Sequence, residues 1–311
     1  MTEIVLHHFD ASPFSEKVRL LLGYKDAPWH SVQIPRILPK PDLMPLTGGY
    51  RKTPVLQLGR DVYCDTRLIA RTIERLYPTP EVVPPALAAS VNALEQLADR
   101  QMFLAAIPVL FRPEGRAALR ERLGDDYLAR FQADRAALFS GGTVSRPDAD
   151  FSAANWEPTL ALLDAQLGAS DYLLGSAPTL ADFAVYHPVW YVRGNAGVGH
   201  TLEAFPSLMQ WFERMRAIGH GQPSALDSTQ ALAMARETTT WQPLAGTFDT
   251  SLGHELGQSI TVGAGDYGVD RISGRLVHLS GDVIVVERDD DTIGPVRVHC
   301  PRAGFVMASA G

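Results

Sequence analysis

Residues 50–78 read YRKTPVLQLGRDVYCDTRLIARTIERLYP, and this stretch decides the fold of the N-terminal part of the chain. Residues 53–58 form an apolar run with a proline at the second position. Residues 61–63 follow after a tight turn that contains glycine, which predicts a β-hairpin. Residues 65–76 then show helical periodicity and end before a tyrosine and a proline. The stretch therefore predicts two antiparallel strands followed by a helix.

The residues before this stretch predict a strand, a helix and a second strand. Residues 3–9 (EIVLHHF) are typical of a short buried strand, and residues 15–25 place apolar and basic side chains on different helical faces. Residues 29–34 indicate another strand. Residues 35–50 contain four prolines and a glycine pair, which predicts a loop. The order β-α-β, loop, β-β-α is that of a thioredoxin-like domain, which we expect over residues 1–80.

The remainder of the chain changes character twice. After a proline-rich linker, long helical stretches predict an all-helical domain over residues 86–240, with a capping-box pattern at Thr179–Asp182. Short strand-like runs then predict a small β-rich module over residues 244–311, such as an open barrel. The expected fold class is thus an α/β thioredoxin-like domain, then an all-α helical domain, then a small C-terminal all-β module.

Composition excludes several classes of function. The chain has 311 residues and a net charge of −7, which argues against binding nucleic acid. We identify neither a signal-like segment nor an apolar run of about 20 residues, so we expect a cytoplasmic protein with no membrane partner. The two cysteines lie far apart in the sequence and suggest neither a disulfide framework nor a metal site.

Ser12 stands where the first strand gives way to the first helix. A helix N-terminus carries unpaired N–H groups and a partial positive charge, which favour an anion such as a thiolate. A serine hydroxyl there can donate a hydrogen bond to the sulfur and lower its pKa. The alternative is that Ser12 is an ordinary N-cap before Pro13. Ser15, inside the first turn, is a second hydroxyl candidate.

Two further short motifs suit the binding of a peptide. If the Thr53–Pro54 bond is cis, the backbone of Thr53 faces a pocket and can pair with an extended peptide; a trans edge proline is the alternative. At the start of the next helix, the Asp65 carboxylate can pair with an ammonium group. The Thr66 hydroxyl and nearby N–H groups can hold a carboxylate. A simple helix cap explains the same two residues.

Three stretches together resemble the glutathione S-transferase family: SPFSEKVRLLL (residues 12–22), residues 50–78, and PTLADFAVY (residues 178–186). The resemblance implies a cis Pro54, a glutathione pocket on the N-terminal domain, and an open apolar pocket between the two domains. It also implies a homodimer. By position, Ser12 matches a residue that is cysteine in omega-like members and serine in zeta-like ones.

The same resemblance implies roles for individual residues. Phe14 matches a pocket aromatic, and Thr53 matches the main-chain partner of the cysteinyl unit of glutathione. Asp65 and Thr66 match the Glu-Ser pair that holds the γ-glutamyl head, with Asp65 one methylene shorter. Lys40 and Lys52 are both candidates for the glycyl carboxylate. The predicted β module lies outside the common two-domain pattern of the family.

Three functional hypotheses follow. The first is a glutathione transferase in which Ser12 stabilises the glutathione thiolate for attack on a small hydrophobic electrophile. Met102, Phe103 and Ile107 are candidates for the wall of the electrophile pocket, although a stripe of core residues along a helix is the preferred explanation. The second hypothesis is a zeta-like isomerase or dehalogenase that regenerates glutathione. The third is a non-catalytic binding or scaffold protein that keeps the fold.

Overall fold

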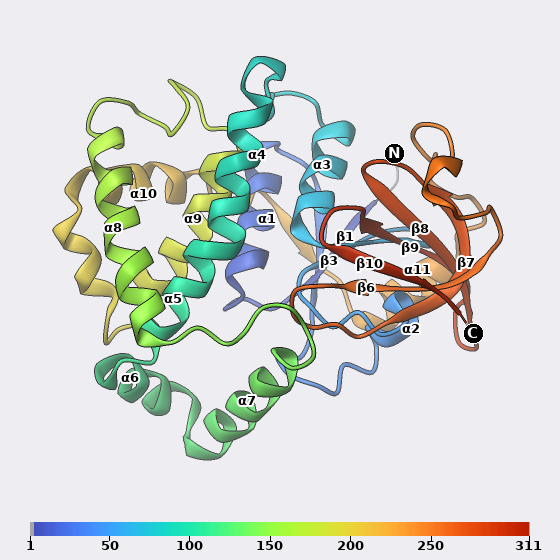
Figure 1. Cartoon of the computed structure of the whole chain (residues 1–311), viewed down its shortest axis with the longest axis horizontal. Coiled ribbons are helices and arrows are strands. Elements are labelled where there is room, and N and C mark those ends of the chain that lie inside the picture. Colours follow the sequence, from blue (N-terminus) through green and yellow to red (C-terminus); the bar gives the residue numbers. More distant parts are fainter. Residues whose placement is uncertain (1–2, 311) are drawn as a thin grey trace.

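A single mixed sheet runs through the protein and carries a bundle of helices at one side (Figure 1). The computed structural model describes residues 3–310. Within these residues the sheet has ten strands, in the order β10-β6-β7-β8-β9-β4-β3-β1-β2-β5. The strands of the N-terminal and C-terminal parts are therefore neighbours in one hydrogen-bonded layer.

The N-terminal part follows the predicted β-α-β, β-β-α order. Its elements are β1 (Ile4–His8), α1 (Pro13–Tyr24), β2 (Trp29–Gln33), α2 (Met44–Thr47), β3 (Val55–Leu58), β4 (Asp61–Cys64) and α3 (Thr66–Leu76). Strand β1 pairs in parallel with β2 and antiparallel with β3, and β3 forms the predicted hairpin with β4. This is the thioredoxin-like domain expected from the sequence.

The middle of the chain is helical, as predicted. It contains α4 (Ala88–Gln96), α5 (Phe103–Leu110), α6 (Pro113–Leu123), α7 (Asp125–Leu138), α8 (Ala149–Leu167), α9 (Leu180–Arg193) and α10 (Pro206–Ile218), with a π-helical turn, Leu97–Met102, between α4 and α5. Short 3-10 helices lie at Pro85–Leu87, Gly199–Ala204 and Thr250–Leu252. The predicted capping box starts α9, and Asp182 also accepts hydrogen bonds from Leu173 N and Trp211 Nε1. These buried bonds fix the N-terminus of the central helix of the bundle.

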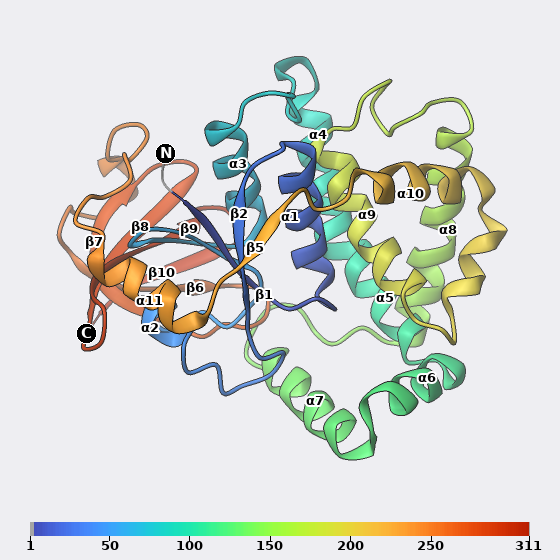
Figure 2. The same ribbon diagram turned by 180° about the vertical axis from the view of Figure 1, so that it is seen from behind.

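After α10 the chain returns to the N-terminal sheet. Strand β5 (Pro223–Ala225) pairs in parallel with β2, and α11 (Ser228–Glu237) follows it. Helices α2 and α11 lie together on one face of the sheet, and α1 and α3 lie on the other (Figure 2). The sheet consequently separates two hydrophobic cores. One is shared with the helical bundle and the other with the C-terminal strands.

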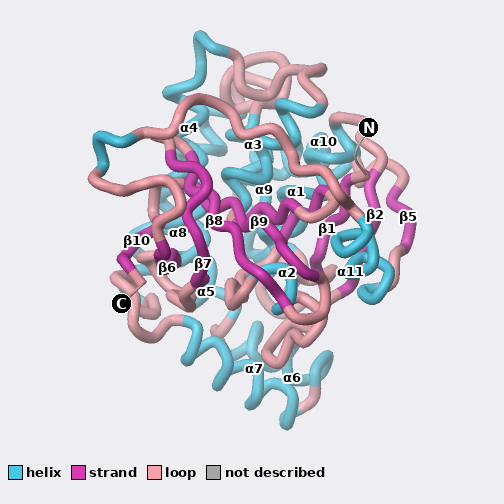
Figure 3. Tube along the Cα trace, turned by 90° about the vertical axis from the view of Figure 1, so that its right-hand side faces the viewer, coloured by secondary structure: helices cyan, strands magenta, loops and turns pink. Residues whose placement is uncertain are grey.

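The C-terminal strands extend the thioredoxin sheet, and they do not form the separate open barrel suggested by the sequence (Figure 3). They are β6 (Ser259–Ala264), β7 (Ile272–Leu279), β8 (Val283–Asp290), β9 (Gly294–Pro301) and β10 (Phe305–Ser309). Strand β9 pairs in parallel with β4, with Asp61 opposite Arg297 and Tyr63 opposite His299. The physical reason is that β4 would otherwise present an unpaired edge of N–H and C=O groups.

Buried side chains reinforce the junction of β4 and β9. His299 Nε2 donates to Asp61 Oδ1 at 2.7 Å, and the His299 ring stacks on Tyr63 with 4.2 Å between centroids. The pKa of His299 is lowered by burial, which the neighbouring Asp61 carboxylate opposes. Cys64 and Cys300 are both buried free thiols on these adjacent strands. The C-terminal module is thus an integral part of the N-terminal domain.

Candidate functional site

Two adjoining cavities lie between the N-terminal domain, the helical bundle and the C-terminal module. Their walls share Phe14, Lys52, Thr53 and Tyr267. The larger cavity encloses about 1250 Å³, including space open to solvent, and its walls are mainly apolar. The smaller cavity encloses about 680 Å³ on the same measure and is more polar. A ligand with a polar peptide part could occupy the smaller cavity and extend toward the larger one.

Ser12 lines the larger cavity at the N-terminus of α1. Its Oγ accepts a hydrogen bond from Ser15 N at 3.2 Å, so it is the N-cap that local sequence predicted. Because the hydroxyl acts there as an acceptor, its own proton is available for a second partner. Ser15 lies in the wall of neither cavity, and its side chain is fully buried. Of the two serine candidates, the structure places only Ser12 at the site.

The Thr53–Pro54 bond is cis, as the family resemblance implied. Thr53 Oγ1 accepts a hydrogen bond from Lys40 Nζ at 2.8 Å, and Lys40 also donates to Arg51 O at 2.9 Å. Burial, together with the nearby charges of Arg135 and Arg51, lowers the pKa of Lys40 to about 7, and the Asp134 carboxylate opposes this shift. Lys40 therefore sits close to its protonation midpoint at neutral pH.

Lys52 lies in both cavities and already has two partners. Its Nζ forms an ion pair with Asp266 at 2.7 Å and lies 4.0 Å from the centroid of the Tyr267 ring. Asp266 and Tyr267 belong to the turn between β6 and β7, which we call the 265–268 turn. A glycyl carboxylate bound at Lys52 would have to share this ammonium group with Asp266.

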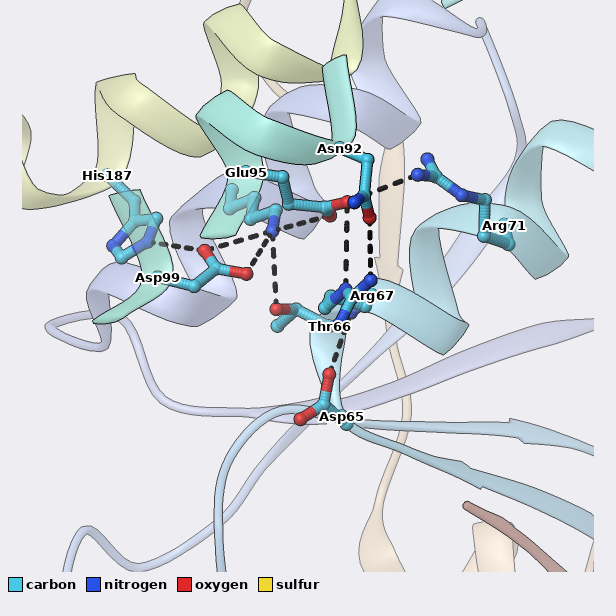
Figure 4. Close-up of polar contacts among 9 residues, drawn as sticks. Asp65, Thr66, Arg67, Arg71, Asn92, Glu95, Asp99 and His187 are labelled. Carbon is cyan, nitrogen blue, oxygen red and sulfur yellow. Dashed lines mark hydrogen bonds and ion pairs between the residues drawn. The ribbon is translucent and has the colours of Figure 1, made fainter. Parts of the chain in front are cut away.

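The second half of the peptide motif lies in the smaller cavity. Asp65 is the N-cap of α3, and its Oδ1 accepts from Arg67 N at 2.9 Å. Its φ angle of 75° is in the left-handed region that non-glycine residues seldom adopt. Desolvation raises the pKa of Asp65, although the bond from Arg67 and the charge of Lys52 oppose this shift. Thr66 lies beside it, and its Oγ1 accepts from Lys17 Nζ at 3.4 Å (Figure 4).

Behind this motif lies a buried charge network that sequence reasoning missed. The Lys17 ammonium, fully buried on α1, contacts Glu95 at 3.1 Å and Asp99 at 2.9 Å (Figure 4). Asp99 also accepts a hydrogen bond from His187 Nε2 of α9 at 3.0 Å. Burial alone would raise the pKa of Asp99, but the Lys17 charge and the His187 bond hold it at about 2. The network joins the wall of the smaller cavity to the helical bundle.

The 265–268 turn is the other part of the site that the sequence did not indicate. The Tyr267 ring stacks on Phe139 with 4.6 Å between centroids, and Gly268 N donates to Leu138 O at 2.7 Å. Gly268 has a φ of 58°, and a Cβ there would lie 3.0 Å or less from Lys52 and Leu138 side-chain atoms. The turn therefore closes against both domains. No local sequence pattern predicts the position of the 265–268 turn, because the residues that it contacts are distant in the sequence.

Of the three helical residues predicted to line the electrophile pocket, two lie in the cavity wall and one does not. Phe103 and Ile107 line the larger cavity, and the Phe103 ring packs on Phe14 with 4.6 Å between centroids. Met102 is fully buried in the hydrophobic core and lines neither cavity. The helical repeat explains this division, since Met102 and Phe103 point about 100° apart around the helix.

Family comparisons agree with this geometry. Residues 6–81 match the model of the glutathione S-transferase N-terminal domain, and residues 117–214 match that of the C-terminal domain. A GST-like protein from Pseudomonas syringae of solved structure is 33% identical, with both chains covered completely and a TM-score of 0.83. The chain belongs to the glutathione S-transferase family. Since that match covers 100% of this chain, it includes the C-terminal module.

A second relative is named for its localisation with FtsZ. FtsZ-localized protein A of Caulobacter vibrioides is 29% identical over 239 residues, which cover 75% of this chain and 95% of that protein. The structure of FzlA from C. crescentus is 26% identical, with a TM-score of 0.50, over 69% of this chain and 88% of that one. Within the described residues, no helix is long and apolar enough to cross a bilayer.

Proposed function

We propose that this protein is a glutathione transferase that activates the glutathione thiol with Ser12. The observation that carries the proposal is the position of Ser12. Its hydroxyl caps α1 in the wall of the larger cavity, and Thr53, next to the cis Pro54, stands in the wall shared with the smaller cavity. The γ-glutamyl head would bind at Asp65 and Thr66, and the cysteinyl unit would pair with the backbone of Thr53.

Catalysis would come from thiolate stabilisation and proximity. The Ser12 Oγ–H would donate to the sulfur at the positive end of α1, which favours the thiolate, and the thiol proton would leave to solvent. The thiolate would attack an electrophilic carbon held near Phe103 and Ile107. A carbon–sulfur bond forms as the bond to the leaving group breaks, and the leaving group departs with the electron pair.

Isothermal titration with reduced glutathione tests binding. Asp65→Ala should weaken binding at least about tenfold, because it removes a charge-assisted contact with the ammonium group. Lys40→Met and Lys52→Met form a matched pair for the glycyl carboxylate, and the variant with the larger loss identifies its partner. Glutathione that binds equally well to all three variants would contradict the proposed orientation.

A pH profile of conjugation tests the role of Ser12. In Ser12→Ala we expect glutathione binding to persist, turnover to fall at least about tenfold, and the pKa of the bound thiol to move upward. Ser15→Ala is the matched control, since that hydroxyl lies outside both cavities. Unchanged turnover in Ser12→Ala would refute the assignment. A substrate that turns over without net consumption of glutathione would instead indicate the isomerase or dehalogenase chemistry.

A non-catalytic binding or scaffold role is the second candidate. The 29% identity to a protein named for FtsZ localisation favours it, as does the 265–268 turn that occupies Lys52. Failure to bind glutathione at millimolar concentration would favour this role over the transferase. The homodimer implied by the resemblance and the cytoplasmic location expected from the sequence remain predictions. Size-exclusion chromatography with light scattering would test the homodimer.

A further inference from the structure

The larger cavity concentrates positive charge in an acidic protein. The whole chain carries a net charge of −7, yet no Asp or Glu is found among the described residues that line this cavity. Its lining includes five arginines, namely Arg36, Arg51, Arg122, Arg135 and Arg146, together with Lys52 and the partly protonated Lys40. Such an excess of one sign in a concave apolar site raises the local concentration of the opposite charge.

Nearby carboxylates compensate only part of this charge. Asp134 is shared by Arg51, at 2.5 Å, and Arg135, whose Nε lies 3.0 Å from it. Asp266 pairs with Lys52. The described part of the chain supplies no ion-pair partner for three other cations of the cavity, which are Arg36, Arg122 and Arg146. The cavity therefore keeps guanidinium groups that are free to bind an anion.

Two of these three guanidinium groups lie over aromatic rings of the cavity wall. The Cζ of Arg36 is 5.8 Å from the Phe9 ring centroid, and that of Arg146 is 5.9 Å from the Phe111 centroid. A guanidinium that rests on a ring keeps its N–H donors in the plane of the group, where they can bind a carboxylate with two hydrogen bonds. The cavity thus combines apolar walls with N–H groups that are available to donate hydrogen bonds to an anion.

We propose that the larger cavity binds an apolar molecule that carries one carboxylate, which Arg36, Arg122 and Arg146 recognise. Describing this molecule as the second substrate rests on the proposed transferase function, whereas its binding does not require glutathione. Arg122 on α6 and Arg146 before α8 belong to the helical part, and Arg36 lies over Phe9 in the loop after β2. Lys40, Arg51 and Lys52 instead lie beside Thr53. The two sets of cations can therefore serve different anions.

Titration with a matched pair of ligands tests the inference. 4-Phenylbutanoate and 4-phenylbutanamide have the same apolar body and differ in charge. We expect the acid to bind at least about tenfold more tightly than the amide, and this advantage should shrink as salt is added. Equal binding of the two, or no binding of the acid, would overturn the inference.

Substitution of exposed arginines locates the anion site. Arg122→Gln and Arg146→Gln, singly and together, should each lower the affinity for the acid severalfold and leave the amide unaffected. Arg130→Gln is the matched control, because Arg130 is exposed, lies over Tyr127 at 5.5 Å and does not line the cavity. Equal losses for acid and amide, or a loss in the control alone, would overturn the assignment.

Two further measurements separate this inference from the transferase proposal. Saturating glutathione should leave the affinity for 4-phenylbutanoate within about twofold; direct competition would mean that the arginines belong to the glutathione site and would overturn the inference. Conjugation of 4-(bromomethyl)benzoate should exceed that of its methyl ester in kcat/KM, with the sulfur–carbon bond forming as bromide leaves. Acid binding without any conjugation would refute the transferase and support the anion pocket.

Discussion

Replacement of Lys17 by methionine should destabilise the protein strongly, because it leaves Glu95 and Asp99 without their shared cation. The side chain of Lys17 is 0% exposed, as is that of Glu95, and that of Asp99 is 12% exposed. Breaking such a buried pair by removing one partner costs about 3–5 kcal/mol. With an unfolding entropy of about 2.1 cal/mol/K per residue, the thermal midpoint should fall by about 5–8 °C.

The pH dependence supplies a signature that lost packing alone would not give. The folded-state pKa of Asp99 is about 2, below the 3.8 of a free carboxyl. This group therefore stabilises the wild type by about 2 kcal/mol above pH 4, and the contribution is lost as pH falls through about 2. In Lys17→Met the carboxyl pKa values rise, and protonation relieves the unpaired charges. The difference in thermal midpoint between Lys17→Met and the wild type should consequently become smaller as the pH is lowered from 7 to 4.

Thermal unfolding followed by circular dichroism, at several pH values, measures both effects. The triple variant Lys17→Met, Glu95→Gln, Asp99→Asn serves as the control, because it removes all three charges and keeps similar volumes. The triple variant should recover a large part of the decrease in thermal midpoint that Lys17→Met causes. A fall of less than about 2 °C in Lys17→Met, or a deficit in the midpoint that stays constant with pH, would show that the Lys17 network does not stabilise the fold.

Three further perturbations test other parts of the structure. Asp266→Asn removes the carboxylate that pairs with Lys52, and titration should show glutathione binding about threefold or more tighter. The exposed Asp270→Asn is the control, and weaker glutathione binding in Asp266→Asn would contradict the prediction. His7 is buried, and desolvation lowers its pKa to about 4, below the ordinary 6.5. The neutral His7 side chain therefore contributes its full stabilisation above pH 6.5, and this contribution is lost as pH falls toward 4. In His7→Gln the thermal midpoint should consequently change less with pH between 6.5 and 4 than it does in the wild type. Deletion of residues 244–311 exposes the edge of β4 and should yield aggregated protein by light scattering; a soluble monomer would contradict the junction with β9.

Local patterns in the sequence determined much of the N-terminal domain and the bundle. The alternation and turn of residues 53–63 produced the hairpin of β3 and β4, because a register set by a tight turn needs only neighbouring residues. Ser12 and Asp65 emerged as helix caps for the same reason, since capping bonds join residues two or three positions apart. The cis state of Pro54 came from the resemblance, and composition or periodicity would not have indicated it.

Only the tertiary structure decided where the C-terminal module goes and what surrounds the site. The pairing of β4 with β9, the 265–268 turn beside Lys52, and the Lys17 network each join residues that are distant in sequence. Lys17 resembles an ordinary charged position on an amphipathic helix, because periodicity reports the face of a residue and not its partner. Long-range partners are chosen by the burial of whole faces and by the need to satisfy each buried polar group, and both are properties of the assembled fold.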